Sequence, residues 1–142
     1  MPLYQCVVPA GKLDDPTRAA LAGAITELHA DITGAPRGFV NVLFTEYAPG
    51  NYFTAGRPNQ GTVIIGAIRA GRDRETRARL LTALSGAWTS ITGDDARTVL
   101  IGLNEVDPTN TMEAGLIMPA PGEEAAWFER HREQLGDLLT MT

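Results

Sequence analysis

Several features that define common classes of protein are scarce in this 142-residue chain. It has one cysteine, Cys6, and two histidines, too few for an internal disulfide or a Cys/His metal cluster. Its net charge is −5, and it lacks the basic stripe of nucleic-acid binders. The longest apolar runs, such as 63–68, are far too short to span a bilayer, and no charged-then-apolar leader precedes the first predicted strand. We therefore expect a cytoplasmic protein with a buried Cys6 thiol, no metal site, and neither nucleic acid nor membrane as partner.

The remaining composition is that of an ordinary globular domain, with 44% hydrophobic and 20% charged residues. Short apolar runs predict strands over 3–8, 39–44, 62–68 and 98–103. Apolar residues at helical spacing predict two helices between the first and second strands and between the third and fourth. Asp15-Pro16 and Asp73 are expected to start these helices, and Gly34 and Gly93 to end them. The intervening segment 48–60 has the composition of a short hairpin.

The pattern of the first half recurs in the second half at an offset of about sixty residues, the scale expected of an internal duplication. Ile32-Thr33-Gly34 recurs as Ile91-Thr92-Gly93, and Ala55-Gly56 recurs as Ala114-Gly115. These matches are ordered along helix and loop, so we divide a single domain, 1–142, into repeats 2–59 and 60–118 and a tail, 119–142.

Each repeat reads as strand, helix and strand, a unit that pairs its two strands in parallel through a right-handed crossover. The sequence therefore predicts an α/β (α+β) fold in which two fused β-α-β units form a four-stranded sheet with both helices on one face. The other face of the sheet must also pack against something. Other copies of the chain are the simplest partner for it, so we expect a homo-oligomer. In the tail, Trp127, Phe128, His131 and Leu135 have helical spacing and predict a short packing helix with His131 exposed to solvent.

Pro2 directly follows the initiator methionine, and its small size permits the removal of Met1. The mature chain then begins with a secondary amine. An α-amino group titrates at roughly 7.7–8.0, and burial or neighbouring positive charge lowers its pKa further. Such an amine can act as a general base, a general acid or a nucleophile. The alternative is that Pro2 is simply the second residue of a strand.

When the two repeats are aligned, they differ at positions where specialised chemistry is expected. His29 aligns with Trp88, Arg69 and Arg72 align with Pro9 and Lys12, and Glu113 aligns with Thr54. Two arginines three residues apart, in a strand-to-helix turn beside a helix N-terminus, are typical of a carboxylate or phosphate receptor. The ordinary alternatives are a half-buried structural histidine, solvated arginines and an exposed glutamate. If the first and third strands run antiparallel, the amine and the arginines meet in one anion pocket.

On these residues the chain resembles the tautomerase superfamily, and in particular its fused-subunit branch typified by cis-3-chloroacrylic acid dehalogenase. The resemblance covers most of the chain. The segments that carry it are Pro2-Leu3-Tyr4, Ala24-Ile25-Thr26 to His29, Ile32-Thr33-Gly34, Pro49-Gly50-Asn51, Arg69-Ala70-Gly71-Arg72, Met112-Glu113-Ala114-Gly115, Pro119-Ala120-Pro121-Gly122 and Trp127-Phe128.

The resemblance implies roles for five residues and a trimeric assembly, with a small carboxylate as substrate and no cofactor. Pro2 matches the catalytic proline that moves a proton at substrate carbon. Arg69 and Arg72 match the arginines that bind the substrate carboxylate, with His29 assisting them. Glu113 matches the glutamate that activates water for attack on the β-carbon.

One position departs from the family pattern. Gly102 stands where the dehalogenase has a tyrosine that helps to position water, and Tyr4, Tyr47 and Tyr52 are the candidates to replace it. The loss of one such group often costs ~10²-fold or more in rate. Proton transfer between oxygen and carbon needs no activated water, so we expect tautomerisation to survive better than dehalogenation.

The sequence is compatible with three functions. The first is a tautomerase that uses Pro2 as acid and base on small unsaturated or 2-oxo carboxylates, with weak hydratase or dehalogenase activity. The second is a hydrolytic dehalogenase or hydratase of cis-3-haloacrylate-type acids. The third is a non-catalytic anion-binding oligomer, which a retained Met1 favours because an amide-linked proline nitrogen has no usable lone pair.

Overall fold

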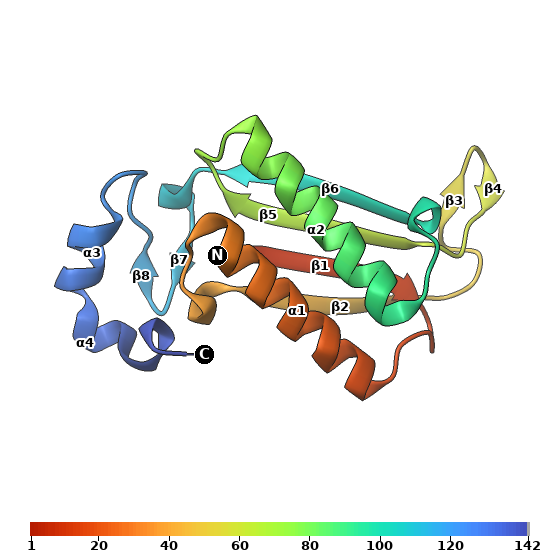
Figure 1. The fold of residues 1–142 in the computed structure, drawn as a ribbon, viewed down its shortest axis with the longest axis horizontal. Coiled ribbons are helices and arrows are strands. Elements are labelled where there is room, and N and C mark those ends of the chain that lie inside the picture. Colours follow the sequence, from red (N-terminus) through yellow and green to blue (C-terminus); the bar gives the residue numbers. More distant parts are fainter. Residues whose placement is uncertain (142) are drawn as a thin grey trace.

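The computed structural model of the chain describes residues 1–141. Figure 1 shows a sheet with two long helices lying across one of its faces, and a separate carboxyl-terminal lobe beside one end of that sheet. The sheet and its helices are β1 (Leu3–Pro9), α1 (Asp15–Thr33), β2 (Asn41–Tyr47), β5 (Thr62–Arg69), α2 (Arg74–Thr92) and β6 (Val99–Val106). The smaller elements are the hairpin strands β3 (Phe53–Thr54), β4 (Arg57–Pro58), β7 (Met112–Glu113) and β8 (Leu116–Ile117), and the tail helices α3 (Glu124–Arg130) and α4 (Arg132–Leu135). Four 3₁₀ turns complete the chain, at Arg37–Phe39, Ala96–Thr98, Pro108–Asn110 and Gly136–Leu139.

The four long strands pair in the order β2-β1-β5-β6. The strands within each half are parallel, β1 with β2 and β5 with β6, whereas β1 and β5 meet antiparallel at the centre. The predicted fold class is therefore confirmed. In the antiparallel register Leu3 lies opposite Ala67, so the start of β1 and the end of β5 lie at the same end of the sheet. This register meets the condition that the sequence set for bringing the amino terminus near the arginines.

Both long helices have 19 residues and similar ends. The second begins as predicted, with the Asp73 side chain accepting a hydrogen bond from the Thr76 amide at 2.7 Å. The prediction that Asp15 caps the first helix was wrong by one residue. The Asp14 carboxylate accepts from the Thr17 amide at 2.8 Å, which makes Asp15 the first helical residue. Gly34 and Gly93 end the helices at φ 76°, the left-handed conformation that glycine adopts without a steric cost.

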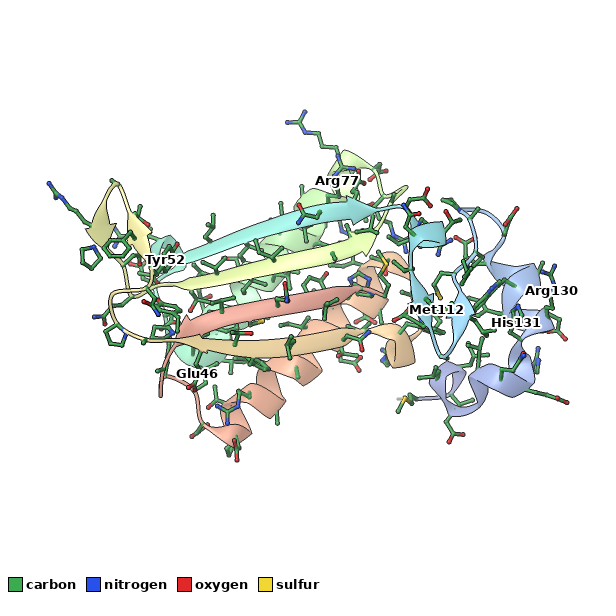
Figure 2. All side chains as sticks on the ribbon, turned by 180° about the vertical axis from the view of Figure 1, so that it is seen from behind. Glu46, Tyr52, Arg77, Met112, Arg130 and His131 are labelled. Carbon is green, nitrogen blue, oxygen red and sulfur yellow. The ribbon has the colours of Figure 1, made fainter. Side chains whose placement is uncertain are left out.

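The main core lies between the two helices and one face of the sheet. Alternate residues of the central strands point into it, including Tyr4, Cys6 and Ile64, which are fully buried. The prediction of a buried Cys6 is thus confirmed, and burial raises the pKa of its thiol to about 12. The opposite face of the sheet is the nearer one in Figure 2, where no helix of residues 1–141 covers it. Leu43 and Leu100 project from this open face and are 49% and 58% exposed.

Two strands differ from the sequence prediction because apolar runs mark only their buried parts. The second strand was expected over 39–44, but β2 starts at Asn41 and continues to Tyr47, opposite Pro9 of β1. Phe39 instead lies in a 3₁₀ turn and is buried against the tail. The fourth strand was expected over 98–103, but β6 runs to Val106 because its hydrogen bonds with β5 continue to Arg69.

The tail forms two short helices rather than the single predicted one. Its core contains Phe39, Met118, Trp127 and Leu135, and the Trp127 indole N–H donates to the Ile117 carbonyl at 3.0 Å. The backbone leaves the helical conformation at His131, between α3 and α4. The prediction that His131 is exposed was wrong, since it is half-buried with its ring 5.0 Å from that of Trp127.

No helix in the described part of the chain, residues 1–141, is long and apolar enough to cross a membrane. No group of three or more His, Cys, Asp or Glu side chains in this range is arranged to hold a metal ion.

Candidate active site

A cavity of about 240 Å³ opens at the end of the sheet where β1 begins and β5 ends. Its wall combines three of the predicted site residues, His29, Arg69 and Arg72, with groups from the amino terminus and the tail. The latter include Met1, Glu124 and Phe128. Thus α1, β5, the β5–α2 turn and α3, which are far apart in the sequence, contribute side chains to one pocket.

The amino terminus is held at this cavity by Asn41 at the start of β2. The Asn41 backbone N–H donates to the Pro2 carbonyl at 3.0 Å, and its side-chain amide donates to the same oxygen at 3.3 Å. Pro2 is fully buried. The preceding Met1 amine is mostly buried and contacts the Glu113 carboxylate. Burial lowers the pKa of this amine, Glu113 acts in the opposite direction, and the charge of Arg69 lowers it further.

Glu113 reaches the amino terminus from the β7–β8 hairpin, whose turn is Ala114-Gly115. Both turn residues have positive φ, 53° and 75°, which is the requirement of a tight two-residue hairpin turn. The same pair in the first repeat, Ala55-Gly56, has φ of 52° and 71°. In the second repeat this turn places Glu113 beside Asn41, whose side-chain amide donates to Glu113 at 3.3 Å. Glu113 therefore contacts the amine rather than forming part of the cavity wall.

His29 is 2% exposed and shares a hydrogen bond of 2.8 Å, through Nδ1, with the hydroxyl of Tyr4. Burial, followed by the positive charges of Arg72 and the amino terminus, lowers the pKa of His29 to about 4. Burial also raises the pKa of the Tyr4 hydroxyl. A protonated hydroxyl facing a neutral imidazole donates to it, so we assign the imidazole proton to Nε2. His29 is therefore a neutral hydrogen-bond donor at pH 7.

Tyr4 fits beneath His29 because the neighbouring strand has a glycine opposite it. Gly66 pairs with Tyr4 in the β1–β5 register. A Cβ atom at position 66 would lie 2.6 Å from Cε1 of Tyr4, a distance that real Cβ contacts do not adopt. Gly66 therefore creates the space for the Tyr4 ring.

The two arginines have different surroundings. Arg69, the last residue of β5, is 14% exposed, and its Nη2 donates to the Pro119 carbonyl at 2.6 Å and pairs with Glu124 at 3.1 Å. No carboxylate within residues 1–141 lies within ion-pair distance of Arg72. Partial burial and the nearby charge of Arg69 lower the pKa of Arg72. Arg72 is thus a cation on the cavity wall that an anionic ligand can neutralise.

The candidates for replacing a tyrosine at position 102 lie in different places. Gly102 is in the middle of β6 opposite Ile65, on the open face of the sheet. Tyr47 lies at the far end of the sheet, where its hydroxyl donates to the Gly61 carbonyl at 2.5 Å and its ring meets that of Tyr52. Figure 2 shows Tyr52 near one end of the sheet and Met112, the neighbour of Glu113, near the other. Of the three tyrosines, Tyr4 reaches the cavity, indirectly through His29.

Sequence reasoning did not assign the roles of three residues that shape this site. Asn41 fixes the amino terminus and Tyr4 orients His29, and neither role has a local sequence signal. Glu124 lies in the tail, which has no counterpart in the repeat, so a comparison of the two halves does not expose it. The acidic pair Glu123-Glu124 at the start of α3 is the feature of the sequence that could have suggested a carboxylate there.

Comparisons with known proteins agree with this architecture. A family model described as "Putative oxalocrotonate tautomerase enzyme" matches residues 1–132. The crystal structure of N1, a member of the cis-3-chloroacrylic acid dehalogenase family, is 32% identical, with a TM-score of 0.91 over 99% of each chain. Native Ps01740 is 40% identical over 78% of this chain and 99% of its own, with a TM-score of 0.75. A fused 4-OT described as a symmetric trimer is 27% identical over 84% of this chain and 98% of its own, with a TM-score of 0.76. No curated protein sequence matches the chain.

Proposed function

The chain belongs to the tautomerase superfamily, in its cis-3-chloroacrylic acid dehalogenase-like branch, and from this membership we propose that it is a tautomerase of small carboxylates. Its acid–base group is the amine of Pro2, exposed by the removal of Met1. Its substrates are small unsaturated or 2-oxo carboxylic acids. The observation that carries the proposal is the meeting of the amino terminus with His29, Arg69 and Arg72 at one cavity of about 240 Å³.

The surroundings of the amino terminus suit an amine that exchanges protons near neutral pH. Burial and Arg69 lower the pKa of the Met1 amine, and the same surroundings act on the Pro2 amine once Met1 is gone. A base whose pKa lies near the working pH is an efficient proton carrier. In the proposed reaction the Pro2 amine removes the enol proton from oxygen and a proton is returned to carbon, so the amine ends in its starting state.

The other three residues orient and polarise the substrate. Arg72, which has no ion-pair partner within residues 1–141, is the proposed anchor for the substrate carboxylate, and Arg69 adds further N–H donors. Neutral His29 offers its Nε2–H as a donor to a substrate oxygen rather than a charge. These donors stabilise the negative charge that develops on oxygen when the enol proton is removed from it.

A second candidate function, hydration or hydrolytic dehalogenation of cis-3-haloacrylate-type acids, is favoured by the position of Glu113. This carboxylate is held by Asn41 beside the amino terminus, where a general base for water is needed. Water adds to the β-carbon, Pro2 delivers a proton to the α-carbon, and the unstable adduct then loses halide. We rank this reaction second because Gly102 has no side chain with which to position water.

The first test is the intact mass of the purified protein before and after exposure to a 3-halopropiolate. Hydration of this alkyne generates an acyl halide beside the amine. Loss of Met1 with one adduct on Pro2 supports water activation, and loss of Met1 without an adduct favours tautomerisation alone. Retention of Met1 contradicts a proline mechanism and favours the non-catalytic anion-binding oligomer.

The second test compares Pro2→Ala with Pro58→Ala, a control at an exposed proline of β4. The assay follows enol-to-keto conversion of a 2-oxo acid by ultraviolet absorbance. We expect kcat/KM to fall on the order of 10²-fold in Pro2→Ala, because this is the scale of general acid–base catalysis. The control should keep the wild-type rate. Unchanged turnover in Pro2→Ala would refute both enzymatic functions.

A further inference from the structure

The cavity wall carries a carboxylate of the protein itself, which the proposed chemistry does not use. Glu124, the first residue of α3, pairs with Arg69 at 3.1 Å and lines the same cavity as Arg72. Arg69 is 14% exposed and Glu124 is 39% exposed, so the pair lies at the edge of the pocket rather than in bulk solvent. The contact joins the tail to the end of β5.

Glu124 is negatively charged at neutral pH. Its partial burial opposes ionisation, but backbone hydrogen bonds, to the carboxylate of Glu124 from its own amide and that of Gly122, together with the charge and hydrogen bond of Arg69, lower its pKa overall. It therefore offsets part of the charge of Arg69. The guanidinium has five N–H donors, so Arg69 can still hydrogen-bond a ligand, with its attraction for an anion reduced by Glu124.

The balance of charge in the cavity follows from these contacts. Glu113 pairs with the Met1 amine, and in the processed chain with the protonated Pro2 amine in its place, while Arg69 pairs with Glu124. Arg72 remains as the cation without an ion-pair partner in residues 1–141. One carboxylate on Arg72 makes the pocket neutral, whereas a second carboxylate would be an uncompensated charge in a partly buried site, close to Glu124.

We propose that Glu124 is a specificity-determining residue, which restricts the site to substrates with one carboxylate and excludes dicarboxylates. This inference rests on the proposed function, since it concerns the same carboxylate site. Glu124 acts by neutralising Arg69 and by repelling a second negative charge. The substrate class is thereby narrowed to monoanionic acids.

The experiment measures the dissociation constants of butanoate and succinate by calorimetric titration at pH 7.5 and fixed ionic strength. Both acids are saturated and do not react, and succinate differs from butanoate by a carboxylate in place of the terminal methyl. The wild type should bind butanoate more tightly. Glu124→Gln, which removes the charge and keeps the shape, should shift the preference toward succinate by about tenfold, the order expected of one charge a few ångströms away.

Glu123→Gln is the matched control, because it removes the same charge from an exposed neighbouring position. It should leave the preference unchanged. Glu124→Ala should shift the preference in the same direction as Glu124→Gln, so a folding defect in one variant leaves the other informative. An unchanged preference in the Glu124 variants, or an equal shift in Glu123→Gln, overturns the proposal.

Arg72→Ala separates this inference from the proposed function. If it keeps the wild-type affinity for both acids, the carboxylate site itself is wrong and the proposed function fails with it. If Arg72→Ala loses both acids while Glu124→Gln keeps the wild-type preference, only the role of Glu124 is refuted.

Discussion

Buried His29 should make the protein sensitive to mild acid. The side chain is 2% exposed, and its pKa falls from the ordinary 6.5 to about 4 because burial and the charges of Arg72 and the amino terminus disfavour the imidazolium. Between pH 6.5 and 4 the unfolded chain therefore binds a proton that the folded chain does not. Stability due to His29 is complete above pH 6.5 and is lost as the pH falls toward 4.

The two pKa values give the size of this effect. Between pH 7.5 and 4.5 the free energy of unfolding should fall by about 2.5 kcal/mol on account of His29 alone, a large part of a marginal stability. The assay is urea denaturation at several pH values and one fixed protein concentration, because assembly would make stability depend on concentration.

Two variants isolate this contribution from that of the carboxylates. His29→Gln keeps a polar side chain and removes the titration, so its stability should fall less steeply between pH 6.5 and 4. His131→Gln removes the other histidine, which is half-buried in the tail, and should retain the wild-type slope. The same slope in wild type and His29→Gln would refute the reasoning and would mean that His29 is not held as a buried neutral group.

Three further predictions test the supports of the site. Tyr4→Phe removes the hydroxyl 2.8 Å from His29 and keeps the ring, so denaturation should show a loss of about 1–3 kcal/mol, the cost of a buried polar group without a partner. Gly66→Ala places a Cβ atom 2.6 Å from the Tyr4 ring, so it should destabilise the fold by about 1–3 kcal/mol by the same assay, and a stable variant would contradict the packing. Leu100→Glu puts a charge on the open face of the sheet, where we expect other subunits to pack. It should therefore lower the mass of the assembly measured by sedimentation, whereas Ala20→Glu on an exposed part of α1 should not.

The arrangement of the sheet was accessible to sequence reasoning because it follows from the duplication. Each repeat specifies a parallel strand pair, and joining two such pairs at their centre brings the start of β1 near the end of β5. The convergence of Pro2, Arg69 and Arg72 was predicted only on the condition that β1 and β5 run antiparallel, which the repeat alone does not fix. The local patterns were less reliable at element ends, as Asp15 and Phe39 show, because capping and turn geometry depend on single hydrogen bonds.

The contacts that the sequence did not reveal join segments with no common pattern. Glu124 approaches Arg69 only because the tail packs its aromatic side chains beside Phe39. Tyr4 reaches His29 only because Gly66 lies opposite it on the neighbouring strand. Each depends on the register or packing of two elements, which hydrophobic periodicity does not encode.

The duplication also explains why the two halves are not equivalent in chemistry. Trp88 occupies the position of the second half that matches His29, and its indole N–H donates to Asp94 at 3.0 Å. Lys12 is the residue of the first half that aligns with Arg72, and it pairs with the same Asp94 at 2.8 Å. Thr62 aligns with Pro2, but it lies inside the chain and so has no free amine. The opposite end of the sheet thus has internal partners for the groups that the amino-terminal end leaves to a ligand, which favours a single site at the amino-terminal end.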